Sequence, residues 1–227
     1  GLTGPFPDGN YRMAHYTGFL NALLDKLQVQ QVVLAGNSLG GQIAWETALA
    51  YPQRVARLIL VDAAGFPLQS TSVPVGFKLA RIPALAPVIS KILPRQMIES
   101  SVRNVYGNPE LVTPQLVDRY YQLTLREGNR EALVQRFSQR DDPALNKARV
   151  SQISIPTLMI WGGRDGLIPP QHAGQFAAAI KGSQVVIFEE LGHVPQEESA
   201  TVTASAVAKF KPLLTGASRL KQDKVAW

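Results

Sequence analysis

Ser38 is the residue in this sequence whose surroundings best suit it to chemistry. It is the centre of residues 36–40, which read GNSLG and follow a short apolar run at residues 32–35; a helical pattern comes next. A serine at so tight a strand-to-helix turn projects its hydroxyl above the carboxyl end of a sheet, and glycines two positions before and after it leave the room that the turn needs. The backbone N–H of Leu39 would then point at a negative oxygen forming beside that hydroxyl. The pentapeptide alone also fits an ordinary turn, so the interpretation requires a base and an acid elsewhere in the chain.

The base is found by elimination, because the chain has three histidines. His15 falls within an expected helix at residues 10–27, where a packing or surface role is expected. His172 stands near an expected helix start, where a solvated position is expected. His193 follows an expected parallel strand in a glycine-containing loop, and such loops at the carboxyl ends of strands line the ligand crevice of an open α/β sheet. His193 is therefore the candidate base.

Asp165 is the candidate acid that would orient this base. It follows an apolar run at residues 157–161 and lies among glycines, a setting that by itself also suits a turn or a helix cap. Its place between Ser38 and His193 matches the chain order serine, acid, histidine of a known triad. Asp62, at the end of the apolar run at residues 58–61, is the competing acid. We prefer Asp165 and keep Asp62 as the alternative.

Strand and helix patterns alternate along the chain in the order that a parallel sheet requires. An insertion at residues 66–150 interrupts them with prolines and two helical patterns, at residues 113–127 and 130–139, and shows no strand pattern. We interpret this insertion as a helical cap over the strand ends. The other expected elements are a helix at 10–27 capped by Asn10, strands at 31–35, 58–61, 157–161 and 184–188, and helices at 40–50, 169–180 and 197–214.

Composition bounds the class of protein. The 227 residues, 45% hydrophobic and 18% charged, fit one soluble domain with an inserted cap: a core of residues 1–65 and 151–227, and a cap of residues 66–150. The absence of cysteine excludes disulfides and a thiolate nucleophile. The net charge of +6 is scattered, without the basic runs of a nucleic-acid groove.

Membrane contact and targeting are the remaining questions that composition addresses. Basic residues between positions 78 and 95 could lie against an anionic membrane surface, although cap helices packing on the core are the preferred interpretation. No apolar stretch approaches the roughly 20 residues of a membrane span, and residues 1–5 lack signal-peptide character. A soluble protein is therefore expected; its compartment is left open, with the cytoplasm preferred.

Four stretches together resemble one family. GNSLGG, LILVDAAGFP, PTLMIWGGRDGLIP and LGHVPQEE, in this order, resemble the α/β-hydrolase superfamily, in particular its capped esterases, lipases and carbon–carbon hydrolases. The resemblance implies a mostly parallel sheet flanked by helices, with Ser38 as nucleophile, His193 as base, Asp165 as the acid and no metal or cofactor. A serine rather than an aspartate at position 38 argues against the haloalkane dehalogenase and epoxide hydrolase branches. Four residues within these stretches are expected to contact substrate: Asn37, Phe66, Trp161 and Val194.

The resemblance implies hydrolysis of small-molecule carboxylic esters through an acyl-enzyme. Two alternatives stay open. One is cleavage of a carbon–carbon bond in ring-opened diketo acids, which similar enzymes perform with the same triad. The other is a truncated, non-catalytic binding module with a hydrolase fold.

The beginning of the sequence departs from the family pattern. Similar proteins usually carry further strands and a His-Gly loop before the stretch that resembles residues 1–5, and that loop supplies a second oxyanion donor. Only the Leu39 N–H is therefore assigned here, and the strand at residues 31–35 is expected to have an unpaired apolar edge. We expect a second copy of the chain, or a separate N-terminal segment, to complete the sheet.

Overall fold

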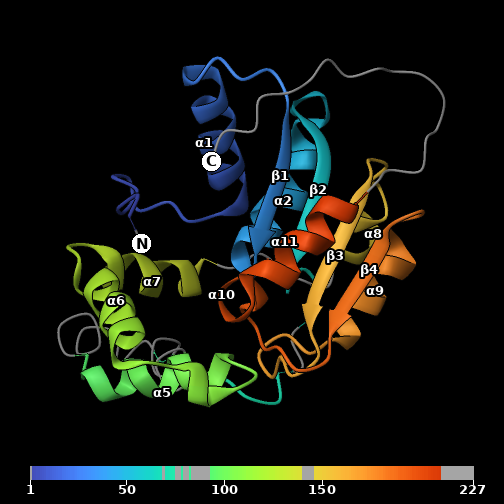
Figure 1. Ribbon diagram of the computed structural model, residues 1–227. Coiled ribbons are helices and arrows are strands. Elements are labelled where there is room, and N and C mark those ends of the chain that lie inside the picture. Colours follow the sequence, from blue (N-terminus) through green and yellow to red (C-terminus); the bar gives the residue numbers. More distant parts are fainter. Residues whose placement is uncertain are drawn as a thin grey trace.

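Four parallel strands form the centre of the molecule (Figure 1). The computed structural model describes residues 2–67, 70–74, 78, 82, 93–139 and 146–210. The strands lie in the order β1-β2-β3-β4, and all their carboxyl ends point toward the same end of the molecule. All four were predicted, with β1, β2 and β3 longer than expected; their bounds are Val32–Asn37, Val55–Val61, Thr157–Gly162 and Gln184–Phe188.

Side-chain alternation along the strands divides the core into two layers. Leu58 and Leu60 of β2 face a layer that includes α2 (Leu39–Ala50) and α9 (Gln171–Ala179). Ile59 of β2 faces the opposite layer, which includes α11 (Ala200–Lys209). The sheet is therefore covered by helices on both faces, as the sequence predicts.

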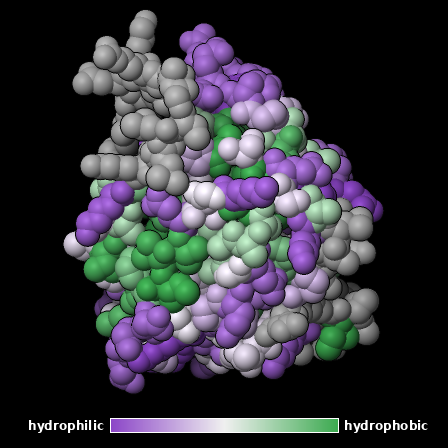
Figure 2. Space-filling view, turned by 90° about the vertical axis from the view of Figure 1, so that its right-hand side faces the viewer, coloured by the Kyte–Doolittle hydropathy of each residue, from purple (hydrophilic) through white to green (hydrophobic). Residues whose placement is uncertain are grey.

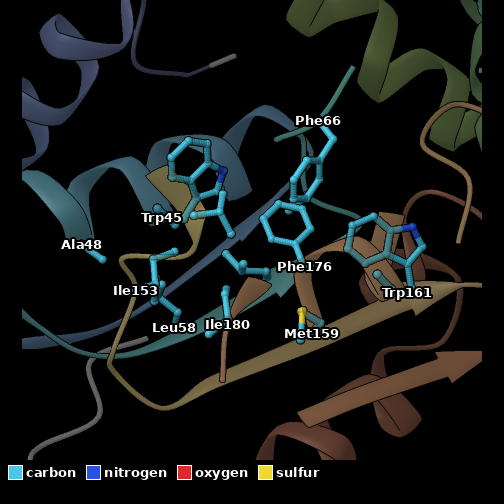
Figure 3. Close-up of a cluster of buried hydrophobic side chains, with 14 of the residues drawn as sticks. Trp45, Ala48, Leu58, Phe66, Ile153, Met159, Trp161, Phe176 and Ile180 are labelled. Carbon is cyan, nitrogen blue, oxygen red and sulfur yellow. The ribbon is translucent and has the colours of Figure 1, made fainter. Parts of the chain in front are cut away.

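The larger core layer is built around aromatic side chains (Figure 3). Trp45 of α2, Trp161 of β3 and Phe176 of α9 are fully buried. Phe66, just after β2, packs edge to face against Phe176 with ring centroids 4.8 Å apart. This layer fixes α2, the helix that begins immediately after Ser38, against the middle of the sheet.

The first and last helices differ from their predicted forms. The first, α1 (Met13–Lys26), begins after Arg12, and the Asn10 side chain accepts a hydrogen bond from the Arg12 N–H instead of capping the helix. The last is two helices, α10 (Pro195–Glu198) and α11, because the backbone angles of Ser199 between them, φ −149° and ψ 78°, are not helical. The expected continuation to residue 214 lies outside the described residues.

Every described regular element of the insertion between β2 and β3 is a helix, and no described residue in it forms a strand. The helical patterns at residues 113–127 and 130–139 correspond to α6 (Pro114–Leu125) and α7 (Asn129–Ser138), whereas α5 (Arg95–Val105) was not predicted. Phe66 and Val150 both pack in the main core, so the division into core and cap at residues 66–150 stays a prediction. Most of the basic stretch at residues 78–95 lies outside the described residues. The other described elements of the insertion are η3 (Pro109–Leu111) and α8 (Asn146–Val150). Outside the insertion, the short η1 (Pro52–Arg54) lies between α2 and β2.

Both edges of the sheet expose apolar side chains. Val33 of β1 is 53% exposed, and Val185 and Ile187 of β4 are each 40% exposed. Figure 2, the view from the side on which β4 lies, shows apolar residues grouped among polar ones. Among the helices formed by described residues, none has the length and apolar character needed to cross a bilayer.

The outer edge of β1 generates a prediction about association. No described strand pairs with this edge, and unpaired apolar edges associate readily. We expect this edge to pair with a second copy of the chain, so the chain as given should form dimers or larger species in light scattering. Val33→Lys should lower the measured mass, because an exposed lysine at an edge opposes association. A monomer at micromolar concentration would contradict pairing between copies.

Candidate active site

Ser38 occupies a strained turn between β1 and α2. Its backbone angles are φ 56° and ψ −120°, and a positive φ is costly for a residue with a Cβ atom. A Cβ atom at Gly36 would lie 2.2 Å from the Gly40 carbonyl oxygen, so only glycine fits there. Gly40 itself has open space, and Gly41 is the second crowded position, because its Cβ would lie 2.5 Å from that of Ala63. The predicted need for a small residue is confirmed at Gly36 and wrong at Gly40.

Hydrogen bonds to the end of β2 hold the strained turn. The Ser38 N–H donates to the Val61 carbonyl oxygen at 3.0 Å, and the Ser38 carbonyl oxygen accepts from the Ala64 N–H at 3.0 Å. Leu39 is the first residue of α2, so its N–H has no acceptor within the helix and lies at the positive end of the helix dipole. This N–H is suited to stabilising an oxyanion beside Ser38.

His193 and Asp165 form a buried pair. The Nδ1 atom of His193 lies 2.7 Å from Oδ2 of Asp165, and the two side chains are 6% and 0% exposed. The other carboxylate oxygen of Asp165 accepts hydrogen bonds from the N–H groups of Leu167 and Ile168, at 2.8 and 3.0 Å. A carboxylate at Nδ1 favours the tautomer that carries its proton there, which leaves Nε2 able to accept one.

Asn37 joins the loop of the nucleophile to the loop of the base. Its Nδ2 group donates to the His193 carbonyl oxygen at 2.9 Å and to that of Val61 at 3.2 Å. The structure thus brings the residue before Ser38 into direct contact with His193. The Nδ2 group of Asn37 thus braces the two loops within the protein, and the expected contact of Asn37 with substrate stays a prediction.

The helical insertion anchors the loop of the base. The His193 N–H donates to the Val105 carbonyl oxygen, at the end of α5, at 2.7 Å. Glu198 of α10 accepts from the Gly192 N–H at 2.7 Å and from the Gly107 N–H at 2.8 Å, so one carboxylate ties this loop to the turn after α5. Sequence reasoning missed Glu198; its only sequence signal is an acidic residue shortly after His193.

Glu197 makes a second connection to the insertion. It accepts hydrogen bonds from Arg119 at 2.6 Å, Tyr120 at 2.9 Å and Tyr106 at 3.2 Å. Burial and the neighbouring Glu197 carboxylate raise the pKa of both tyrosine hydroxyls, so these remain hydrogen-bond donors at neutral pH. Together Glu197 and Glu198 fix α10, which follows His193, against α5 and α6.

The remaining expected substrate contacts lie in packed interiors. The Trp161 side chain is 0% exposed and donates from Nε1 to the Ile168 carbonyl oxygen at 2.8 Å. Phe66 is buried against Phe176. Val194 is buried in a cluster with residues of α5 and α6. The structure assigns these three side chains to packing, and it gives no support to their predicted contact with substrate.

The other two histidines lie in environments that differ from each other. His15 is partly exposed, 3.7 Å from Asp8, in agreement with the expected surface or packing role. His172 is 2% exposed, so its expected solvated position was wrong. It lies on the inner side of α9, 6.3 Å from Phe66 between ring centroids, and burial lowers its pKa.

Asp62, the competing acid, lies beside the candidate pair. Its Oδ1 accepts a hydrogen bond from the Gly162 N–H at 2.9 Å, and its backbone has φ 43°. One ligand atom from each of Asp62, Asp165 and His193 lies within 4.8 Å of the others. His193 Nδ1 and Asp165 Oδ2 form a hydrogen bond with each other, so we assign no metal to this group.

The anchoring of the His193 loop leads to a prediction. Glu198→Ala should lower the free energy of unfolding by about 1–3 kcal/mol, because the backbone N–H groups of Gly192 and Gly107 lose their acceptor. Urea unfolding followed by circular dichroism measures this. Glu189→Ala, at an exposed acid of the same loop, is the matched control and should change stability by less than about 0.5 kcal/mol. Equal effects of the two substitutions would contradict the anchoring role.

Comparison with known proteins places this arrangement among hydrolases. A 2-hydroxymuconate semialdehyde hydrolase from Pseudomonas sp. (strain CF600) is 31% identical over 208 residues, which cover 89% of this chain and 70% of that protein. Lipase 1 of Psychrobacter immobilis is 27% identical over 206 residues, covering 90% and 63%. An uncharacterised protein of Mycobacterium tuberculosis is 29% identical over 220 residues, covering 90% and 62%. The chain thus spans 62% to 70% of the length of these relatives.

Solved structures share the fold. A meta-cleavage product hydrolase from Pseudomonas fluorescens IP01 superposes with a TM-score of 0.74 at 24% identity, covering 88% of this chain and 72% of that one. An esterase from Exiguobacterium antarcticum gives 0.70 at 23% identity, covering 87% and 73%. A family model described as the alpha/beta hydrolase fold matches residues 3–200. With most of its length matched and its parallel sheet in agreement, this chain belongs to the alpha/beta hydrolase family.

Proposed function

We propose that this protein is a serine hydrolase that cleaves small carboxylic esters through an acyl-enzyme. The observation that carries the proposal is the buried hydrogen bond of 2.7 Å between His193 and Asp165, in a loop that Asn37 ties to the turn of Ser38. Serine hydroxyls are weak nucleophiles until an adjacent base removes their proton. The proposal gives each of these residues a role that its surroundings support.

In the first step the Ser38 Oγ attacks the ester carbonyl carbon while Nε2 of His193 takes the hydroxyl proton. The Leu39 N–H stabilises the negative oxygen of the tetrahedral intermediate, and Asp165 stabilises the imidazolium. The imidazolium then returns the proton to the departing alcohol, leaving an acyl-Ser38. Water repeats the sequence to release the acid.

A second candidate reaction is hydrolysis of a carbon–carbon bond in a ring-opened diketo acid. Relatives named as 2-hydroxymuconate semialdehyde hydrolases match this chain at 29% and 31% identity, beside a lipase at 27%. The same nucleophile, base and acid would serve this reaction, with carbon in place of oxygen as the leaving atom. The two candidates differ in substrate, not in Ser38, His193 and Asp165.

Replacement of the proposed nucleophile tests the mechanism. Ser38→Ala should lower kcat for a nitrophenyl ester by about 10⁴-fold or more, because no covalent intermediate can form. A fluorescent fluorophosphonate should label the unchanged protein at Ser38 and leave Ser38→Ala unlabelled. Ser70→Ala, at another serine whose hydroxyl donates to the Leu167 carbonyl oxygen, is the control and should still be labelled.

Two results would contradict this proposal. Unchanged ester turnover in Ser38→Ala would exclude Ser38 as the nucleophile. A folded wild-type protein that the fluorophosphonate does not label would favour a non-catalytic binding module.

A substrate comparison separates the two candidate reactions. We expect kcat/KM for a short-chain nitrophenyl ester to exceed that for a ring-opened dienoate by at least about tenfold, which corresponds to 1.4 kcal/mol of transition-state stabilisation. Absorbance follows both reactions on one preparation, and Ser38→Ala measures the background of each. A preference for the dienoate would replace ester hydrolysis with carbon–carbon hydrolysis.

A further inference from the structure

Asp62 and Asp165 are two carboxyl groups buried side by side. Their residues are 0% and 3% exposed, and they belong to the same group of atoms within 4.8 Å that includes His193. Water therefore screens neither charge well. Bringing two ionised carboxylates together in such a place is unfavourable, so one of them is expected to hold a proton.

The hydrogen bonds show which of the two suits the proton. Asp165 accepts three bonds from nitrogen donors, at Leu167, Ile168 and His193, an arrangement typical of a carboxylate. Asp62 accepts one, from the Gly162 N–H to Oδ1. Its Oδ2 is buried and, among the described residues, has no hydrogen-bond partner. A proton on Oδ2 turns this unsatisfied acceptor into a donor.

The charged groups around Asp62 favour the neutral form. Burial raises its pKa well above the ordinary value, and the Asp165 carboxylate beside it raises it further, as does Glu198 of α10. The histidines of this region are His193, which bonds Asp165, and the buried His172 of α9, whose pKa burial lowers. Among the described residues, the contact that opposes this is the Gly162 N–H, which stabilises the charged form.

We propose that Asp62 is a neutral carboxylic acid that donates a hydrogen bond from Oδ2 to the Asp165 carboxylate, and that it is a positioning residue for the proposed base. The positioning role rests on the proposed function; the protonation of Asp62 does not. Asp62 holds its proton throughout the reaction: the proton that Ser38 loses goes to Nε2 of His193 and returns from there to the leaving group. The donated bond fixes the rotation of the Asp165 carboxylate and reduces its basicity, so the Nδ1 proton stays on His193.

Asp62→Asn is the decisive variant, because an amide has the shape and the donor of a neutral carboxyl group. Its oxygen accepts from the Gly162 N–H and its NH₂ group donates to Asp165. Asparagine also tolerates the positive φ of this position. Asp62→Ala removes the donor, and Asp118→Asn, at a carboxylate on the exposed side of α6, is the matched control.

Infrared spectroscopy tests the protonation without relying on activity. At about pH 8 ordinary carboxyl groups are ionised, so a protonated C=O band that persists in the unchanged protein identifies a neutral acid. We expect this band to remain in Asp118→Asn and to disappear in Asp62→Asn. Absence of the band in the unchanged protein, or its persistence in Asp62→Asn, would overturn the proposal. If Asp62→Asn fails to fold, the pH titration of the band in the unchanged protein decides instead, because ionisation near the ordinary pKa of about 4 overturns it.

The pH dependence of kcat/KM tests the positioning role. If Asp62 is already neutral, Asp62→Asn removes no charge, and the acid limb that reports His193 should move by less than about half a pH unit. A larger shift toward low pH would show that a negative charge was lost, which overturns the proposal. Asp62→Ala should lower kcat about tenfold with KM little changed, and Asp62→Asn should restore it. Full activity of Asp62→Ala would overturn the positioning role, while the infrared result would still stand for the protonation.

Discussion

The contact on which the candidate site depends is the buried hydrogen bond between His193 and Asp165. It is possible because β3 and β4 are parallel neighbours, so that the loops after these two strands meet at the carboxyl end of the sheet. Each partner is then fixed from a different direction. Backbone N–H groups of Leu167 and Ile168 hold the carboxylate, and the Val105 carbonyl oxygen holds the main chain of the imidazole residue.

Much of this arrangement was readable from the sequence because it depends on local patterns. Each strand is a short apolar run, and residues 36–40 specify the turn of Ser38 through the crowding at Gly36. The histidine choice followed from position after a strand, which is also local. These signals were enough for the parallel sheet and for the meeting of His193 with Asp165.

Other features escaped prediction because they depend on contacts between distant parts of the chain. The Glu198 carboxylate accepts from Gly107, which lies in the insertion, and no spacing in the sequence indicates that pairing. The burial of His172 depends on α9 packing against the sheet beside Phe66. The burial of Trp161 and Val194 likewise depends on packing between elements that are distant in the sequence.

The bond from the His193 N–H to the Val105 carbonyl oxygen has a consequence for protein engineering. The described part of the insertion contacts the His193 loop and the helix after it through Val105 and Gly107, so a chimera that exchanges the insertion also exchanges the groups that hold this loop. A transplanted segment would have to supply a carbonyl group at the same point and a backbone amide for Glu198. Chimeras designed on pocket shape alone would lose these hydrogen bonds to the His193 loop. The resulting loss of activity would be mistaken for poor substrate binding.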